Sequence, residues 1–250
     1  MSYMAMGRYA PYRCQVSGVR CQRNTHKYLE PKTYNLKPVL LLGGSFNPAH
    51  AGHLYISREA MKRLGVHETW WLVSPGNPLK EKKDMADFQA RYEKARQVAR
   101  ADRRIKVSDF ELHLSPRRRP GSTSSKKNVD TGLRRHDTFY TVDTIRALQQ
   151  RYPDRQFIWL MGADNLAQFH RWKRWLEIAY KIPIVIFTRA PHDMAALHSK
   201  AALRFAQNRL NFERYTIGSG KLPKWTYIFS AKSPLSATVL RKTLGKRAFL

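Results

Sequence analysis

Residues 38–53 have the sequence PVLLLGGSFNPAHAGH, in which a short apolar run is followed by two glycines and a turn ending in two histidines. A continuous apolar run that ends in glycine is typical of a strand buried on both faces of a sheet. After the turn, from about His50 to Leu64, apolar residues recur at helical spacing, and Gly65 is placed to end that helix. This part of the chain therefore predicts a buried strand, a tight turn and a helix.

The same alternation of short apolar runs and helical patterns continues toward the C-terminus. Strands that alternate with helices predict an α/β fold, a Rossmann-like doubly wound parallel sheet with helices on both faces. In such a sheet, ligands bind at the carboxyl ends of the strands, near the switch in strand order. The further strands are predicted at residues 69–73, 105–110, 157–161, 184–187 and 227–229, and the further helices at about residues 87–101, 138–150, 166–180, 192–210 and 236–244.

The composition limits the classes of protein to consider. The chain has 250 residues, of which 42% are hydrophobic, and two cysteines, Cys14 and Cys21. This is enough for one sizeable core, and it excludes a disulfide framework or a cysteine-rich metal site within that core. No apolar run is long enough to span a bilayer, and no secretory signal is evident, so we expect a cytoplasmic protein that does not act at a membrane.

The net charge is +28, and part of it lies in two segments without a predicted element. Residues 1–37 hold seven Lys or Arg against one acidic residue, and residues 115–136 hold another seven against one. We expect residues 1–37 to form a basic, disordered tail, residues 38–250 to form the folded domain, and residues 115–137 to form a long basic loop within it. The charge also fits a nucleic-acid-binding protein, but no recognised nucleic-acid motif occurs, which disfavours that class.

His50 and His53 are three residues apart and would face the same way on the first turn of the predicted helix. A helix N-terminus carries unpaired N–H groups and a partial positive charge, so two imidazoles beside it make a suitable cradle for a triphosphate. A His-x-x-His pair also occurs in metal sites, but no third ligand follows at a characteristic spacing. The lysine-bearing phosphate loop is absent. We therefore expect a phosphate site and no metal held by protein ligands.

Residues 44–53, GSFNPAHAGH, resemble the Gly-x-Phe-Asp/Asn-Pro-x-His-x-Gly-His signature of the nucleotidyltransferase superfamily. That superfamily includes the nicotinate- and nicotinamide-mononucleotide adenylyltransferases, phosphopantetheine adenylyltransferase and the glycerol-phosphate cytidylyltransferases. The resemblance implies that both histidines of the signature contact the phosphates of ATP. A second segment, residues 235–241 (LSATVLR), resembles the family's Ile-Ser-x-Thr-x-Ile-Arg and would complete the phosphate site from a capped helix.

Further segments resemble the nicotinate-mononucleotide adenylyltransferases within that superfamily. Residues 162–172 (GADNLAQFHRW) resemble a segment whose aspartate helps to hold the nucleotide and whose tryptophan stacks on the nicotinate ring. Stacking of an electron-poor pyridinium on indole is physically sensible. Residues 140–144 (YTVDT) resemble a segment whose first threonine lies at the pyridine carboxylate. Residues 74–80 (SPGNPLK) resemble a loop with its lysine near phosphate, and Arg189 would border the adenine site.

The resemblance covers about residues 38–245 and implies adenylyl transfer from ATP to nicotinate mononucleotide. Nicotinamide mononucleotide and phosphopantetheine are the alternative acceptors. The tail at residues 1–37 has no counterpart in the family, and residues 115–137 replace a shorter connection. Mg²⁺ would be carried with ATP, since no protein cage for it is evident. The enzyme would be a monomer or a homodimer.

The resemblance assigns roles to individual residues of this chain. The implied catalytic residues are His50, His53 and Arg241. The implied ATP-binding residues are Gly43, Gly44, Ser45, Phe46, His50, His53, Gly162, Asp164, Arg189, Ser236, Thr238 and Arg241, and the implied nicotinate-nucleotide-binding residues are Asn47, Lys80, Thr141 and Trp172.

Overall fold

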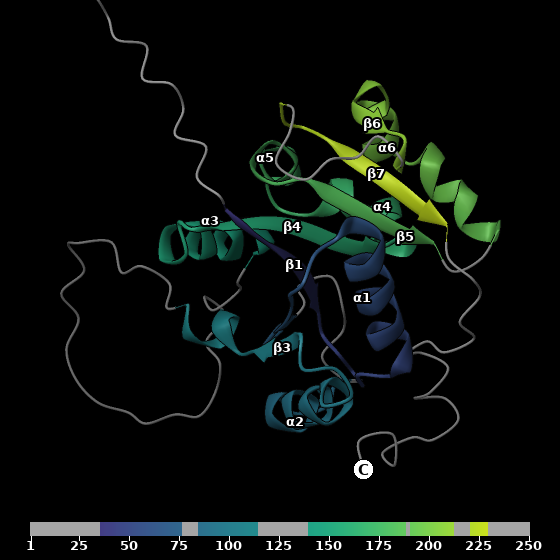
Figure 1. Cartoon of the computed structure of the whole chain (residues 1–250). Coiled ribbons are helices and arrows are strands. Elements are labelled where there is room, and N and C mark those ends of the chain that lie inside the picture. The colour runs from purple at the N-terminus through teal and green to yellow at the C-terminus, as the bar shows by residue number, and fades with distance from the viewer. Residues whose placement is uncertain (1–35, 77–84, 115–139, 189–190, 213–220, 230–250) are drawn as a thin grey trace, which may run out of the picture. The chain divides into compact units, whose positions relative to one another are not determined.

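A computed structural model describes residues 36–76, 85–114, 140–188, 191–212 and 221–229. Their core is a seven-stranded sheet in the order β3-β2-β1-β4-β5-β7-β6, and every pair of neighbouring strands is parallel (Figure 1). The strands are β1 (Lys37–Gly44), β2 (Thr69–Val73), β3 (Ile105–Ser108), β4 (Arg155–Gly162), β5 (Ile184–Thr188), β6 (Arg209–Leu210) and β7 (Trp225–Phe229).

Helices connect these strands and confirm the predicted doubly wound α/β fold. The α-helices are α1 (Ala51–Leu64), α2 (Phe88–Ala99), α3 (Thr141–Arg151), α4 (Ala163–Gln168), α5 (Trp175–Lys181) and α6 (Lys200–Arg204). The short 3₁₀ helices are η2 (Phe110–His113), η3 (Phe169–Arg171), η4 (Pro191–His198) and η5 (Ala206–Asn208). None of the helices in the described ranges is long and apolar enough to cross a membrane.

The strand order reverses between β1 and β4. The chain runs outward from β1 through β2 to β3, and then returns to place β4 on the other side of β1. The connections that follow β1 and β4 therefore lie on opposite faces of the sheet, and folds of this kind bind ligands at the carboxyl ends of the strands at such a point. Gly43 and Gly44 end β1 and Gly162 ends β4, so the topology brings these predicted site residues to the switch point.

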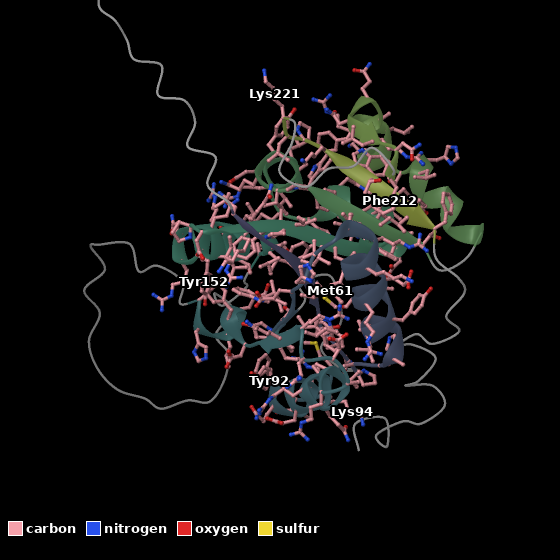
Figure 2. All side chains as sticks on the ribbon, viewed as in Figure 1. Met61, Tyr92, Lys94, Tyr152, Phe212 and Lys221 are labelled. Atoms are coloured by element: carbon pink, nitrogen blue, oxygen red, sulfur yellow. The ribbon has the colours of Figure 1, made fainter. Side chains whose placement is uncertain are left out.

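Adjacent residues of the central strands enter two separate hydrophobic cores. Val39 and Leu41 of β1 lie in the core that contains α3, α4, α5 and α6, whereas Leu40 and Leu42 lie in the core that contains α1 and α2. Met61 of α1, which is labelled in Figure 2, belongs to the second of these cores. Because both faces of the sheet are covered, each central strand is apolar throughout, and this explains the continuous apolar runs in the sequence.

Two of the predicted helices are wrong in their extent. The single helix expected over residues 166–180 is divided among α4, η3 and α5, with Trp172 in an extended conformation and Arg174 at a positive φ of 52°. At this break, Phe169 packs edge-on against both Trp172 and Trp175. The helix expected over residues 192–210 is instead η4, α6, η5 and the short edge strand β6.

The strand predicted over residues 105–110 is also too long, because β3 ends at Ser108 and Phe110 begins η2. The other boundaries differ by a few residues at most or lie outside the described residues. Strand β2 has the predicted bounds, and Asp87 caps α2 as expected by accepting a hydrogen bond from the Gln89 N–H. Strand β1 begins at Lys37, the residue expected to end the tail. The rest of that tail up to residue 35, the loop at residues 115–137 and the helix predicted at residues 236–244 lie outside the described residues.

Candidate active site

The first turn of α1 is capped by the two histidines themselves. His50 is the N-cap residue, with an extended backbone, and its Nδ1 accepts a hydrogen bond of 3.0 Å from the Gly52 N–H. The Nδ1 of His53 accepts in turn from the His50 N–H at 3.2 Å. The two side chains thus form a capping box, the role that Ser or Thr and Glu usually have.

This capping box determines which ring nitrogen of each histidine carries the proton. Because the Nδ1 atoms of His50 and His53 accept from backbone N–H groups, the proton of each neutral ring lies on Nε2. The two ring centroids are 4.0 Å apart, so the helix N-terminus carries two Nε2–H donors close together. Two such donors beside the positive end of a helix dipole suit a phosphate oxyanion.

Aromatic packing holds the second histidine in place. Phe46, at a positive φ of 45°, lies 4.9 Å from the His53 ring and stacks on Trp71 at 5.2 Å between centroids. The Trp71 indole N–H donates to the Ser57 hydroxyl at 2.9 Å, and that hydroxyl donates to the His53 carbonyl at 2.8 Å. A side chain fixed on both sides in this way loses little further conformational freedom when it binds a ligand.

The glycines at the strand ends differ in how much room surrounds them. A Cβ added to Gly43 would lie 2.5 Å from the buried ring of Trp159, so packing within the protein excludes a side chain there. A Cβ on Gly44 would lie no closer than 3.8 Å to a neighbour, which is ordinary contact. At Gly162, a Cβ would meet the Asp164 carboxylate at 2.3 Å, so this carboxylate lies directly over the end of β4.

Arg91 of α2 is a buried residue of the site that the sequence reasoning missed. Its guanidinium is 1% exposed and donates to the carbonyls of Ser45 at 2.7 Å, Ser74 at 2.8 Å and Ala86 at 2.9 Å. A further bond of 3.3 Å reaches the carbonyl of Pro75. Burial lowers the pKa of the Arg91 guanidinium from its ordinary value. The available signal was an arginine in the apolar stripe of α2, four residues before Ala95.

Asn47 lies beside this cluster and is 6% exposed. Its side-chain oxygen accepts a hydrogen bond of 3.1 Å from the Ala86 N–H, just before α2. The carbonyl of the same Ala86 accepts from Arg91. The turn that follows β1 is therefore joined to the start of α2 by the bond from Ala86 to Asn47 and by the bond from Arg91 to the Ser45 carbonyl.

Glu111 is a second buried charged residue that the sequence reasoning missed. It is 7% exposed, follows β3, and accepts a hydrogen bond of 3.0 Å from the Thr144 hydroxyl of α3. Burial raises the pKa of the Glu111 carboxyl to about 7, although hydrogen bonds with Thr144 and Ser74 act to lower it. Thr144 lies one helical turn after Thr141, the residue expected at the pyridine carboxylate.

We expect Glu111→Gln to make the protein more stable at about pH 8 than the wild type, by at most about 3 kcal/mol. The carboxyl has a raised pKa of about 7 in the folded state against an ordinary value of 4.5. Between these two pKa values the folded state binds more protons than the unfolded state. The unfolding free energy of the wild type therefore falls as the pH rises through this range. Denaturant unfolding at several pH values measures this, with the exposed Glu93→Gln as control. An advantage that does not grow between about pH 5 and pH 8 would contradict the expectation.

The structure brings several of the predicted site residues together around the switch point. Trp159 of β4 contacts Gly43 at the end of β1 and packs edge-on against Trp172, with ring centroids 6.1 Å apart and planes at 89°. Trp172 is partly buried, and Thr141 opens α3. The predicted residues that lie outside the described residues are Lys80, Arg189, Ser236, Thr238 and Arg241.

Comparison with known proteins agrees with this arrangement. Residues 41–242 match the family described as cytidylyltransferase-like. A protein of Brucella suis biovar 1 (strain 1330), named probable nicotinate-nucleotide adenylyltransferase, is 40% identical over 83% of this chain and 96% of its own length. A protein of the same name from Methylorubrum extorquens (strain PA1) is 40% identical over 80% of this chain and 97% of its own length.

A solved structure shares the fold. The nicotinic acid mononucleotide adenylyltransferase of Plasmodium falciparum, complexed with NaAD, aligns with a TM-score of 0.57 over 84% of this chain and 85% of its own, at 17% sequence identity. At this low identity the likeness bears on the fold alone.

Proposed function

Because this chain belongs to the cytidylyltransferase-like family, we propose that it transfers the adenylyl group of ATP to nicotinate mononucleotide, a step of NAD biosynthesis. The products are nicotinate adenine dinucleotide and pyrophosphate. The observation that carries the proposal is the 40% identity, over most of both chains, to relatives named for this reaction. The histidine-capped helix at the sheet's switch point supports it, because it offers donors to phosphate where such folds bind nucleotides.

The chemistry is a direct displacement at phosphorus. An oxygen of the 5′-phosphate of nicotinate mononucleotide attacks the α-phosphorus of ATP, and the bond from that phosphorus to the bridging oxygen of the β-phosphate breaks. Pyrophosphate takes the bonding electrons and leaves. The attacking group is already an anion, so positioning of the two phosphates and stabilisation of their charge are the main requirements.

In this proposal, the Nε2–H groups of His50 and His53 donate to the phosphates of ATP. Thr141 and Trp172 hold the pyridine ring. The other residues assigned by resemblance, including Arg241, keep their predicted roles. Among the described residues, no three His, Cys, Asp or Glu side chains gather as a metal site would require, and we propose that Mg²⁺ arrives as part of the substrate MgATP. The oligomeric state, monomer or homodimer, and the cytoplasmic location also stay predictions of the sequence.

The test of the proposed function is a comparison of acceptors. The full chain is incubated with MgATP and, separately, nicotinate mononucleotide, nicotinamide mononucleotide or phosphopantetheine, and pyrophosphate release is followed. We expect the highest kcat/KM with nicotinate mononucleotide, and nicotinate adenine dinucleotide as its product. A higher kcat/KM with phosphopantetheine, or release that does not depend on any acceptor, would overturn the proposal.

We expect Trp172→Ala to raise the KM for nicotinate mononucleotide about tenfold, because ring stacking contributes on the order of 1 kcal/mol beyond burial. The KM for ATP should be unchanged, which makes it the internal control. Trp172→Phe should recover most of the loss, since phenylalanine also stacks. If the KM values of both substrates rise equally in Trp172→Ala, the ring supports the fold and does not contact the pyridine.

A further inference from the structure

The buried guanidinium of Arg91 donates hydrogen bonds to backbone carbonyls of three separate segments. The carbonyls belong to Ser45 after β1, to Ser74 and Pro75 after β2, and to Ala86 before α2. A buried cation that lacks hydrogen-bond partners is costly, so these segments and the guanidinium stabilise one another only in this arrangement. Arg91 and the four carbonyls that it binds, called here the Arg91 hub, therefore hold the turn after β1 and the loop after β2 at a fixed separation.

The Arg91 hub also sets the direction of two peptide groups, one in the turn after β1 and one in the loop after β2. The peptide bonds of Ser45 to Phe46 and of Pro75 to Gly76 are trans, because the cis bonds in the described ranges are Asn47–Pro48 and Leu222–Pro223. In a trans peptide the N–H points opposite to the C=O. With both carbonyls directed at Arg91, the N–H groups of Phe46 and Gly76 point away from it.

Ser74 connects Arg91 to the buried Glu111. Its N–H donates to the Gly44 carbonyl at 2.9 Å, and its own carbonyl accepts from Arg91 at 2.8 Å. Its hydroxyl bonds both the Gly76 carbonyl and Glu111. The bond to Glu111 lowers the pKa of that carboxyl, so the Ser74 hydroxyl is the donor, and its one proton is shared between Glu111 and the Gly76 carbonyl.

The other side of Glu111 leads to the predicted pyridine site. Thr144 is fully buried and donates its hydroxyl proton to Glu111 at 3.0 Å. Thr144 and Thr141 are three residues apart on α3, so a displacement of one carries the other with it. A continuous path of hydrogen bonds thus runs from the turn after β1, through Arg91, Ser74 and Glu111, to the first turn of α3.

We propose that Arg91 and Glu111 are positioning residues that hold the ATP side and the nicotinate side of the active site at the separation needed for transfer. This inference rests on the proposed function and deepens it. Neither side chain needs to touch a substrate. In an in-line displacement the two reacting phosphates must meet in near-attack geometry, and a misplacement of about 1 Å costs about 100-fold in rate.

The test separates positioning from binding and from folding. Arg91→Lys keeps the charge but cannot reach four carbonyls, and Glu111→Ala removes the link to Ser74. Both variants should lower kcat at saturating substrates by at least about tenfold per folded molecule, with little change in the KM of either substrate. Glu111→Gln, whose amide can donate to Ser74 and accept from Thr144, should keep most of the wild-type kcat. Arg96→Lys, an exposed arginine on the same helix, is the matched control.

The outcomes are distinguishable from failure of the proposed function, because wild-type turnover with nicotinate mononucleotide is measured first. A folded Arg91→Lys or Glu111→Ala variant with wild-type kcat would overturn the inference. So would a loss of activity that only follows the folded fraction, measured by circular dichroism at the assay temperature. If Arg91→Lys does not fold, the comparison of kcat between Glu111→Ala and Glu111→Gln tests the inference. A Glu111→Gln variant that is as slow as Glu111→Ala counts against it.

Discussion

We expect His53→Ala to lower kcat by about two orders of magnitude or more, because it removes a phosphate donor comparable to one donor of an oxyanion hole, about 3 kcal/mol. The donor in question is the Nε2–H, which the cap places on the far side of the ring from the backbone. The fold should persist, since the lost cap costs about 1 kcal/mol. Steady-state kinetics with ATP and nicotinate mononucleotide measures the effect.

The same position allows the cap to be separated from the phosphate contact. In His53→Asn, the side-chain oxygen occupies the place of Nδ1 and can still accept from the His50 N–H, but no donor remains at the place of Nε2. We expect this variant to be as slow as His53→Ala and more stable in thermal unfolding. His67→Ala, at an exposed histidine after α1, is the matched control. Near-wild-type turnover of either His53 variant would remove the basis for the phosphate role.

We expect Gly44→Ala to lower kcat/KM for ATP by about 100-fold while leaving thermal stability unchanged, since a group displaced by about 1 Å loses that much. The protein itself has room for the methyl group, whose nearest neighbour would be a Phe46 ring atom at 3.8 Å. The expected loss comes from the ligand, because glycine allows a close approach of backbone to a nucleotide.

Gly43→Ala provides the contrast at the neighbouring position. Its methyl group would meet Trp159 at 2.5 Å, so this variant should lose about 1–3 kcal/mol of stability through overpacking. Thermal unfolding and calorimetric titration with ATP, applied to both variants, separate the two effects. A Gly44→Ala protein that binds and turns over ATP normally would show that no ligand approaches this glycine.

The elements that were predicted correctly are those whose pattern depends on neighbours in the sequence. The bounds of β2 and the Asp87 cap of α2 are local features of this kind, set by burial on both faces and by a side chain reaching its own backbone. The helix predicted over residues 166–180 failed because Phe169, Trp172 and Trp175 follow the packing of their rings against one another. The periodicity of apolar residues along the chain does not show where such ring packing interrupts a helix.

The sequence by itself determined the alternation of buried strands and helices, the strand, turn and helix around residues 43–53, and the family resemblance. The alternation and the turn follow from local spacing, and the resemblance follows from motifs that can be read directly in the chain. Only the tertiary structure decided that the histidines cap α1 through Nδ1, that the protein has room for a side chain at Gly44 but not at Gly43, and that Arg91 and Glu111 are buried. The physical reason is the separation of the partners: the guanidinium of Arg91 binds the carbonyl of a residue 46 positions away. Burial and charge compensation at that distance exist only once the sheet has assembled.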